Sequence, residues 1–163
     1  GLIEYLNKLD ALGGLDIFFI GHGPEKNQAS HLAYIKPFSG AQSHHIAGLI
    51  PISSSILEHH ISKFKAGGSV VSEGDENECR SAGYILTLGP AAILQAKKVV
   101  QSVVDADSAP AKIQTYANVF NTRLSSDKEE VLHQLNSNPG LWVRFHPNAQ
   151  SFVLPSLEVN SVE

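Results

Sequence analysis

Apolar residues follow two different spacings along the first 20 positions of the chain. The helical spacing of three and four residues appears at Leu2, Ile3, Leu6, Leu9 and Leu12. Residues 16–20 (DIFFI) instead form a short, mostly apolar run that ends at a glycine. Such a run is typical of a strand that is buried on both faces of a parallel sheet. The pattern therefore predicts a helix, a glycine cap at residues 13–14, and then a central strand.

The same alternation continues through the rest of the chain. Strands are expected over residues 46–52, 84–88, 99–104 and 151–154. Helices are expected over residues 55–64, where Ser55 and Glu58 resemble a capping box, and over residues 90–97, 112–121 and 127–135. Residues 65–77 are rich in glycine and acidic side chains and are expected to form a loop. This order predicts one α/β domain over residues 1–163, a three-layer Rossmann-like fold with a mostly parallel sheet flanked by helices.

The amino-acid composition of the chain limits the classes of partner that we expect. The 163 residues are 42% hydrophobic and carry a formal net charge of −4, with a pI near 6.0. This charge gives no electrostatic reason to expect nucleic acid or an anionic membrane as a partner. No apolar run approaches the ~18 residues of a membrane span. The single cysteine, Cys79, suits a reducing compartment, so we expect a cytoplasmic protein.

Polar and titratable residues are dense in the loop that follows the first expected strand. They include His22, Glu25, Lys26, Asn27, His31 and Lys36. In open α/β sheets ligands bind just beyond the carboxyl ends of the strands. Gly21 and Gly23 would let a ligand approach the backbone closely, and histidines can transfer protons near neutral pH. A solvated polar loop without a site explains the sequence about equally well.

Other candidate sites are weaker. His44-His45 and His59-His60 are adjacent pairs, whose side chains do not face one another on a helix or strand, so no metal is expected. The dinucleotide pattern G-x-G-x-x-G is absent, and no cofactor is expected. Gly89-Pro90 predicts a helix start whose N–H groups favour a phosphate.

Four stretches together resemble the glucosamine-6-phosphate isomerase/deaminase and 6-phosphogluconolactonase superfamily. In order, they are GGLDIFFIGHGPE with SHLAYIKPFSG, then Ser62-Lys63-Phe64, the strand 84–88 with its following helix, and Phe145-His146-Pro147-Asn148. The resemblance covers most of the chain. It implies that these residues are the second, C-terminal half of a longer chain with part of the sheet elsewhere, a view that the lack of Met also suggests. It further implies a sugar-phosphate partner and a homo-oligomer.

The resemblance implies roles for residues, with substitutions at key places. The family's loop carries an Asp two residues before a His and then a Glu. An ungapped alignment puts Glu25 and Asn27 at the first two places, whereas a gapped one puts His31 at the histidine and Lys36 at the glutamate. Lys63 stands for a family arginine, and Lys112 falls near a phosphate-binding lysine. Lysine holds phosphate as a point charge, without the two-pronged contact of arginine.

Three functions follow as hypotheses. In the first, Lys63, Lys112 and Gly89 bind the phosphate of an amino sugar or hexose, and His31, with Glu25 and His22, opens the ring by acid–base catalysis. Gly21, Gly23, Asn27 and Lys36 would then line the substrate. In the second, the same residues bind a sugar phosphate without turnover, as a sensor would. The third is lactone hydrolysis, although Asn27 occupies the place of that family's catalytic histidine.

Overall fold

The computed structural model describes residues 1–25, 29–52, 54–104 and 111–155. The chain divides into two compact units, residues 1–48 with 87–163 and residues 49–86. The expectation of one domain over residues 1–163 stays a prediction. Within the described ranges, no helix is long and apolar enough to cross a membrane.

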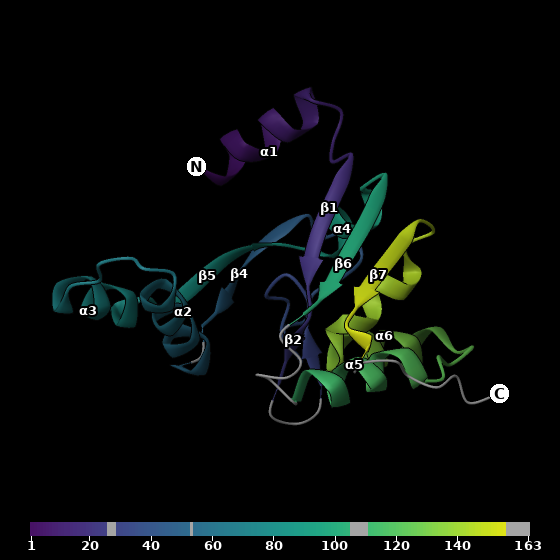
Figure 1. The fold of residues 1–163 in the computed structure, drawn as a ribbon. Coiled ribbons are helices and arrows are strands. Elements are labelled where there is room, and N and C mark those ends of the chain that lie inside the picture. The colour runs from purple at the N-terminus through teal and green to yellow at the C-terminus, as the bar shows by residue number, and fades with distance from the viewer. Residues whose placement is uncertain (26–28, 53, 105–110, 156–163) are drawn as a thin grey trace. The chain divides into compact units, whose positions relative to one another are not determined.

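The first unit is built on a parallel, three-stranded sheet (Figure 1). Its strands are β1 (Ile17–Gly21), β6 (Lys98–Val103) and β7 (Ala149–Val153), in the order β1-β6-β7. Phe19 lies opposite Val100 in the β1–β6 pair, and Val100 lies opposite Gln150 in the β6–β7 pair. Because β6 has a strand on each side, the prediction of a central strand near Val99 is confirmed.

Helices flank this sheet. They are α4 (Pro90–Gln95), α5 (Ala111–Asn121), α6 (Lys128–Ser137) and the 3-10 helix η1 (Pro139–Phe145), whereas α1 (Leu2–Ala11) precedes β1 and has no buried residue. Helix α6 begins where the Asp127 carboxylate accepts a hydrogen bond from the Glu130 N–H at 2.9 Å. The parallel sheet with its flanking helices confirms the predicted α/β class.

One hydrophobic core joins the sheet to these helices. Its buried members are Ile20, Leu32, Ile35, Ile93, Ala96, Val99, Val119, Leu135, Leu141, Trp142 and Val143. They come from β1 and β6, from α4, α5, α6 and η1, and from the loop after β1. This core fixes the positions of the segments that carry the candidate site.

The prediction that β1 is buried on both faces is wrong for this chain. Ile20 is buried and Phe18 packs against the core, whereas Phe19 is 73% exposed and Ile17 is 47% exposed. Successive side chains of a strand point to opposite faces. One face of β1 therefore packs on the core, and the other carries exposed apolar side chains.

The strand predicted at residues 84–88 exists but is not a buried member of the parallel sheet. It is β5 (Tyr84–Leu88), which pairs with β4 (Ala47–Pro51) in a separate two-stranded sheet. Tyr84 is 65% exposed and Leu86 is 53% exposed, so the expected burial is wrong. A two-stranded sheet gives such side chains few neighbours.

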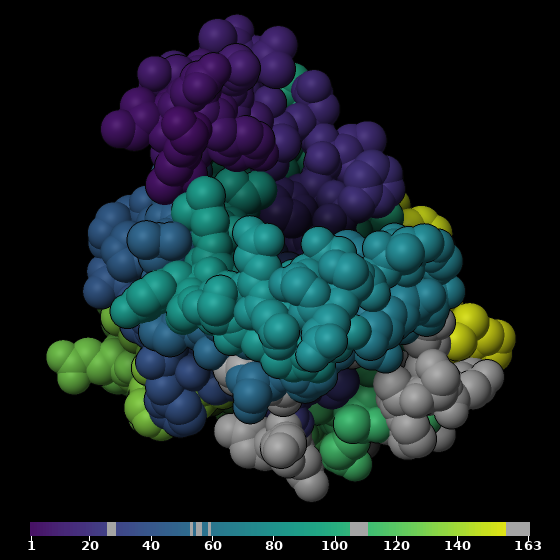
Figure 2. Space-filling model, turned by 90° about the vertical axis from the view of Figure 1, so that its left-hand side faces the viewer, coloured from purple at the N-terminus to yellow at the C-terminus, as the bar shows by residue number. Residues whose placement is uncertain are grey.

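In the second unit, the helices are α2 (Ser54–Ala66) and α3 (Glu73–Ser81), whose surfaces appear in Figure 2. The predicted loop over residues 65–77 is wrong, because α3 begins at Glu73. Its capping box is Ser72 with Asp75, whereas Ser55 lies inside α2.

Arg80 joins the two helices of this unit. Its guanidinium donates to Glu58 on α2, with Nε 2.9 Å from Oε1, and to Glu76 on α3, with Nη1 2.9 Å from Oε2. Lys65 also pairs with Glu76. The hydrogen bonds from Lys65 and Arg80 lower the pKa of Glu76. The unit is therefore held partly by an exposed charge network.

A substitution at Gly140, at the start of η1, would test how tightly the first unit is packed. A Cβ atom there would lie 1.9 Å from Ser30 Oγ and 2.7 Å from Val119 Cγ2. We expect Gly140→Ala to lower the free energy of unfolding by about 1–3 kcal/mol, because a buried methyl group has no space there. Gly48→Ala is the matched control, since no atom lies within 4 Å of its Cβ position. Equal urea midpoints for the two variants would contradict this packing.

Candidate functional site

The candidate site lies at the carboxyl end of the parallel sheet. His22 directly follows β1, and Val104 directly follows β6. Helix α5 lies at this edge, since its Tyr116 packs against Val103 at the end of β6, as Val153 of β7 also does (Figure 1). Carboxyl ends of parallel strands are where open α/β sheets bind ligands. The first unit thus places the predicted loop and α5 together.

His22 is buried against α5 and is 4% exposed. Its Nε2 lies 2.8 Å from Thr115 Oγ1, and the ring of Tyr116 meets its imidazole edge-on at 5.7 Å between centroids. The Thr115 hydroxyl donates to the Lys112 carbonyl oxygen at 3.2 Å, so its single hydrogen is already used. We infer that His22 donates from Nε2–H. Nδ1 then carries the lone pair, and it finds no partner among the described residues.

The environment keeps His22 neutral at pH 7. Burial, followed by the charges of His31 and Lys112, lowers the pKa of His22 from 6.5 to about 4. A neutral imidazole can accept or donate a hydrogen bond, but it cannot supply a proton as an acid near neutrality. His22 is therefore suited to hold the neighbouring Thr115 hydroxyl.

His31 forms a pair with Glu25. Its Nδ1 lies 3.1 Å from Glu25 Oε1, and the two side chains are about 20% and 24% exposed. The pair is formed by the short antiparallel ribbon of β2 (Gly23–Pro24) and β3 (Ser30–His31). A carboxylate on Nδ1 holds the proton there and leaves the lone pair on Nε2. This arrangement suits His31 as a general base.

Gly23 is the residue that leaves room for this imidazole. A Cβ atom at position 23 would lie 1.9 Å from His31 Nε2 and 2.0 Å from its Cε1. The sequence predicts that glycine here admits a ligand to the backbone. In the structure the same space is taken by the His31 ring.

A strained turn packs an aromatic ring against His31. Leu32 and Ile35 exchange backbone hydrogen bonds, and the turn residues between them, Ala33 and Tyr34, have φ of 46° and 60°. Positive φ at both central positions defines a type I′ turn and is unfavourable without glycine. The Thr87 hydroxyl donates to the Ala33 carbonyl. The Tyr34 ring lies nearly parallel to that of His31, with centroids 5.7 Å apart.

The sequence does not single out Thr115, Tyr116 or Tyr34. Thr115 lies 93 positions from His22, and nothing in its local pattern marks contact with the loop. Tyr34 belongs to the quoted stretch SHLAYIKPFSG but has no charge or metal-binding group that would draw attention. Their positions come from tertiary packing.

The lysines that were predicted to contact the substrate lie on different elements. Lys112, in the first turn of α5, donates from Nζ to the Val104 carbonyl at 3.0 Å and is close enough to lower the His22 pKa. Lys36 is half-buried after the Leu32–Ile35 turn. Lys63 lies on α2 in the second unit. Asn27 lies outside the described residues, and Gly21 ends β1.

Gly89 caps α4, and this end of the helix is already engaged. The N–H of Gly89 donates to the Ile46 carbonyl at 2.9 Å, and the N–H of Ala91 donates to the His45 carbonyl at 3.0 Å. A Cβ atom at position 89 would lie 2.2 Å from the His45 carbonyl oxygen. Two of the N–H groups expected to hold phosphate are therefore taken. Among the described residues, no group of three metal-binding side chains gathers.

Comparison with known proteins identifies the fold. No family model and no curated protein sequence matches the chain. A solved structure described as a monomeric glucosamine-6-phosphate deaminase, a missing link of the NagB superfamily, matches 94% of this chain with a TM-score of 0.62 and 15% sequence identity. The match covers 51% of the deaminase chain, so these residues span about half its length. The likeness shows that this chain has that α/β fold.

Proposed function

We propose that this protein acts on a phosphorylated amino sugar or hexose, as a sugar-phosphate isomerase or deaminase does. The observation that carries the proposal is the contact between Glu25 and His31 at the carboxyl end of β1. Support comes from the fold, which is similar to that of a glucosamine-6-phosphate deaminase. The proposed reaction begins with ring opening.

Ring opening of a cyclic sugar moves one proton between two oxygens. Nε2 of His31 would take the proton from the anomeric hydroxyl, the bond between C1 and the ring oxygen would break, and the imidazolium would return the proton to that oxygen. Glu25 on Nδ1 stabilises the imidazolium formed in between. His22, buried and neutral at pH 7, would hold the loop on α5 through Thr115.

Lys112 would bind the phosphate in this proposal. It lies near His22 on α5, and its ammonium group is a point charge that can contact phosphate oxygens. Lys36 and Lys63 are further proposed contacts, taken from the sequence. Hydrogen transfer between the sugar carbons would need a base in addition to these residues.

The test combines turnover and binding. We expect ammonia release or isomerisation with glucosamine-6-phosphate, and a loss of at least about a hundredfold in His31→Gln. His133→Gln is the matched control, because His133 is exposed on α6. Absence of both turnover and calorimetric binding for a panel of phosphosugars would remove the proposal.

A second candidate is a non-catalytic sugar-phosphate binding protein. It is favoured by the low pKa of His22, which removes that residue as an acid near pH 7 and leaves the His31–Glu25 pair to do all of the proton transfer. This candidate predicts saturable binding without turnover. Lys112→Ala or Lys63→Ala would weaken binding. Turnover would be absent both from the unmodified protein and from His31→Gln.

A further inference from the structure

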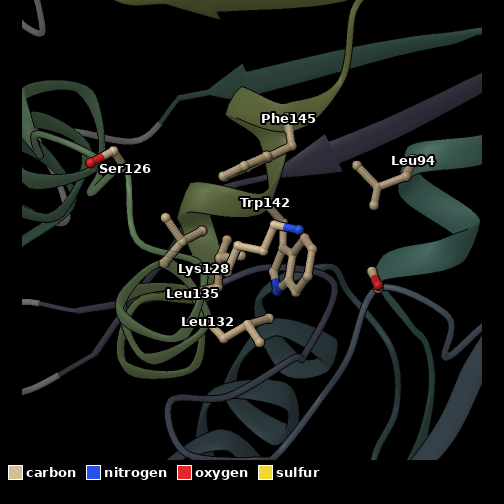
Figure 3. A pocket seen from close by; sticks show the side chains of 9 residues that line it. Leu94, Ser126, Lys128, Leu132, Leu135, Trp142 and Phe145 are labelled. Atoms are coloured by element: carbon tan, nitrogen blue, oxygen red, sulfur yellow. The ribbon is translucent and has the colours of Figure 1, made fainter.

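A cavity in the first unit shares no residue with the His22–His31 site. It has a volume of about 530 Å³, within the range of small-molecule pockets. Its apolar walls are Leu94, Val131, Leu132, Leu135, Trp142 and Phe145 (Figure 3). On α6, Lys128, Val131, Leu132 and Leu135 follow the spacing of one helix face. This face borders an open hollow along part of its length.

The polar groups of this cavity favour a negatively charged ligand. Lys128 is the charged residue that lines it, Ser43 and Ser126 also belong to the lining, and no carboxylate contributes to it. Figure 3 shows the Lys128 side chain running toward the indole of Trp142. The nearby Asp127 carboxylate is engaged by the Glu130 N–H, as the cap of α6.

Trp142 forms a buried wall of the cavity. It is 3% exposed, and its indole Nε1 finds no hydrogen-bond partner among the described residues. Because that nitrogen is fully buried, the ring lines the cavity as an apolar wall. Lys128 thus provides one ammonium group in a cavity whose walls, Trp142 included, are mostly apolar.

We propose that this cavity binds a small organic anion with an apolar, aromatic-sized body and a carboxylate. The body would contact the Leu132, Leu135 and Phe145 side chains, and the carboxylate would lie toward Lys128. Lys8, on α1, does not line the cavity and provides a matched control. This binding is separate from the proposed action on sugar phosphates.

The chain contains one tryptophan, so its indole N–H gives one assigned signal in a ¹H–¹⁵N spectrum. We would titrate the whole chain with 4-phenylbutyrate and with its neutral amide. The signal should shift saturably with both, and the carboxylate should bind about fivefold more tightly, as expected for one partly exposed charge pair. Lys128→Ala should abolish this preference, Lys8→Ala should keep it, and Leu132→Ser should weaken binding of both probes.

Three results would overturn the proposal. The first is no saturable shift of the Trp142 signal with either probe. The second is equal affinity for the carboxylate and the amide in the unmodified protein. The third is a signal that depends on protein concentration alone and does not respond to either probe, which would mean that a second copy covers the cavity. None of these outcomes depends on whether sugar phosphates are turned over.

Discussion

Replacing Gly23 with alanine is expected to displace the His31 imidazole and to remove most of the proposed activity. The added methyl group would occupy a position 1.9 Å from Nε2 and 2.4 Å from Cδ2 of that ring. Because the ring is the end of a side chain, it can swing aside, so the loss of stability should stay below about 3 kcal/mol. The pair with Glu25 would be broken, and turnover should fall by about a hundredfold or more.

Gly21→Ala provides the matched control for this substitution. Gly21 lies two positions away, and no atom approaches within 4 Å of its Cβ position. The His31 imidazole signals in NMR spectra should move in Gly23→Ala and remain in place in Gly21→Ala. Unchanged His31 signals in a folded Gly23→Ala protein would contradict the observed close packing.

Acid should destabilise the protein through His22. The unfolded chain takes up a proton at this residue near pH 6.5, while the folded protein keeps it neutral down to about pH 4. The unfolded state therefore binds more protons in this window, and the free energy of unfolding falls as pH drops through it. The full contribution is about 3 kcal/mol, from a lowering of the pKa by roughly two and a half units.

Urea unfolding at several pH values measures this effect. His22→Gln removes the titrating group, so its stability should fall less between about pH 6.5 and about pH 4 than that of the unmodified protein. The exposed His133 is the matched position, and His133→Gln should retain the full acid sensitivity. Parallel pH profiles for the unmodified protein and His22→Gln would show that His22 is not buried as described.

Part of the site could be predicted because its members are close in sequence. Glu25 and His31 are six positions apart on either side of a short ribbon, and the loop after an apolar strand marks them as candidates. Thr115 and Tyr116 reach His22 from α5, and such contacts depend on how α5 packs across the ends of β6 and β7. A single sequence carries no local signal for that packing.

The secondary structure, like the site, could be predicted only in part. The helices near residues 2–12, 112–121 and 127–135 were predictable from the spacing of their apolar residues, and they correspond to α1, α5 and α6. Helix α3 was missed because it is polar and lies in a glycine-rich stretch, although Ser72 with Asp75 is a capping signal. The exposure of Phe19 could not be predicted from an apolar run, which shows hydrophobicity and not which face is covered.

The most direct test follows the histidine imidazole signals while glucosamine-6-phosphate is added to the protein. We predict that the signals of His31 and His22 shift saturably, that His133 does not respond, and that inorganic phosphate at the same concentration produces smaller shifts. The account would be contradicted if His31 stayed unmoved in the folded protein at every concentration of the sugar phosphate, or if all histidines, His133 included, shifted alike.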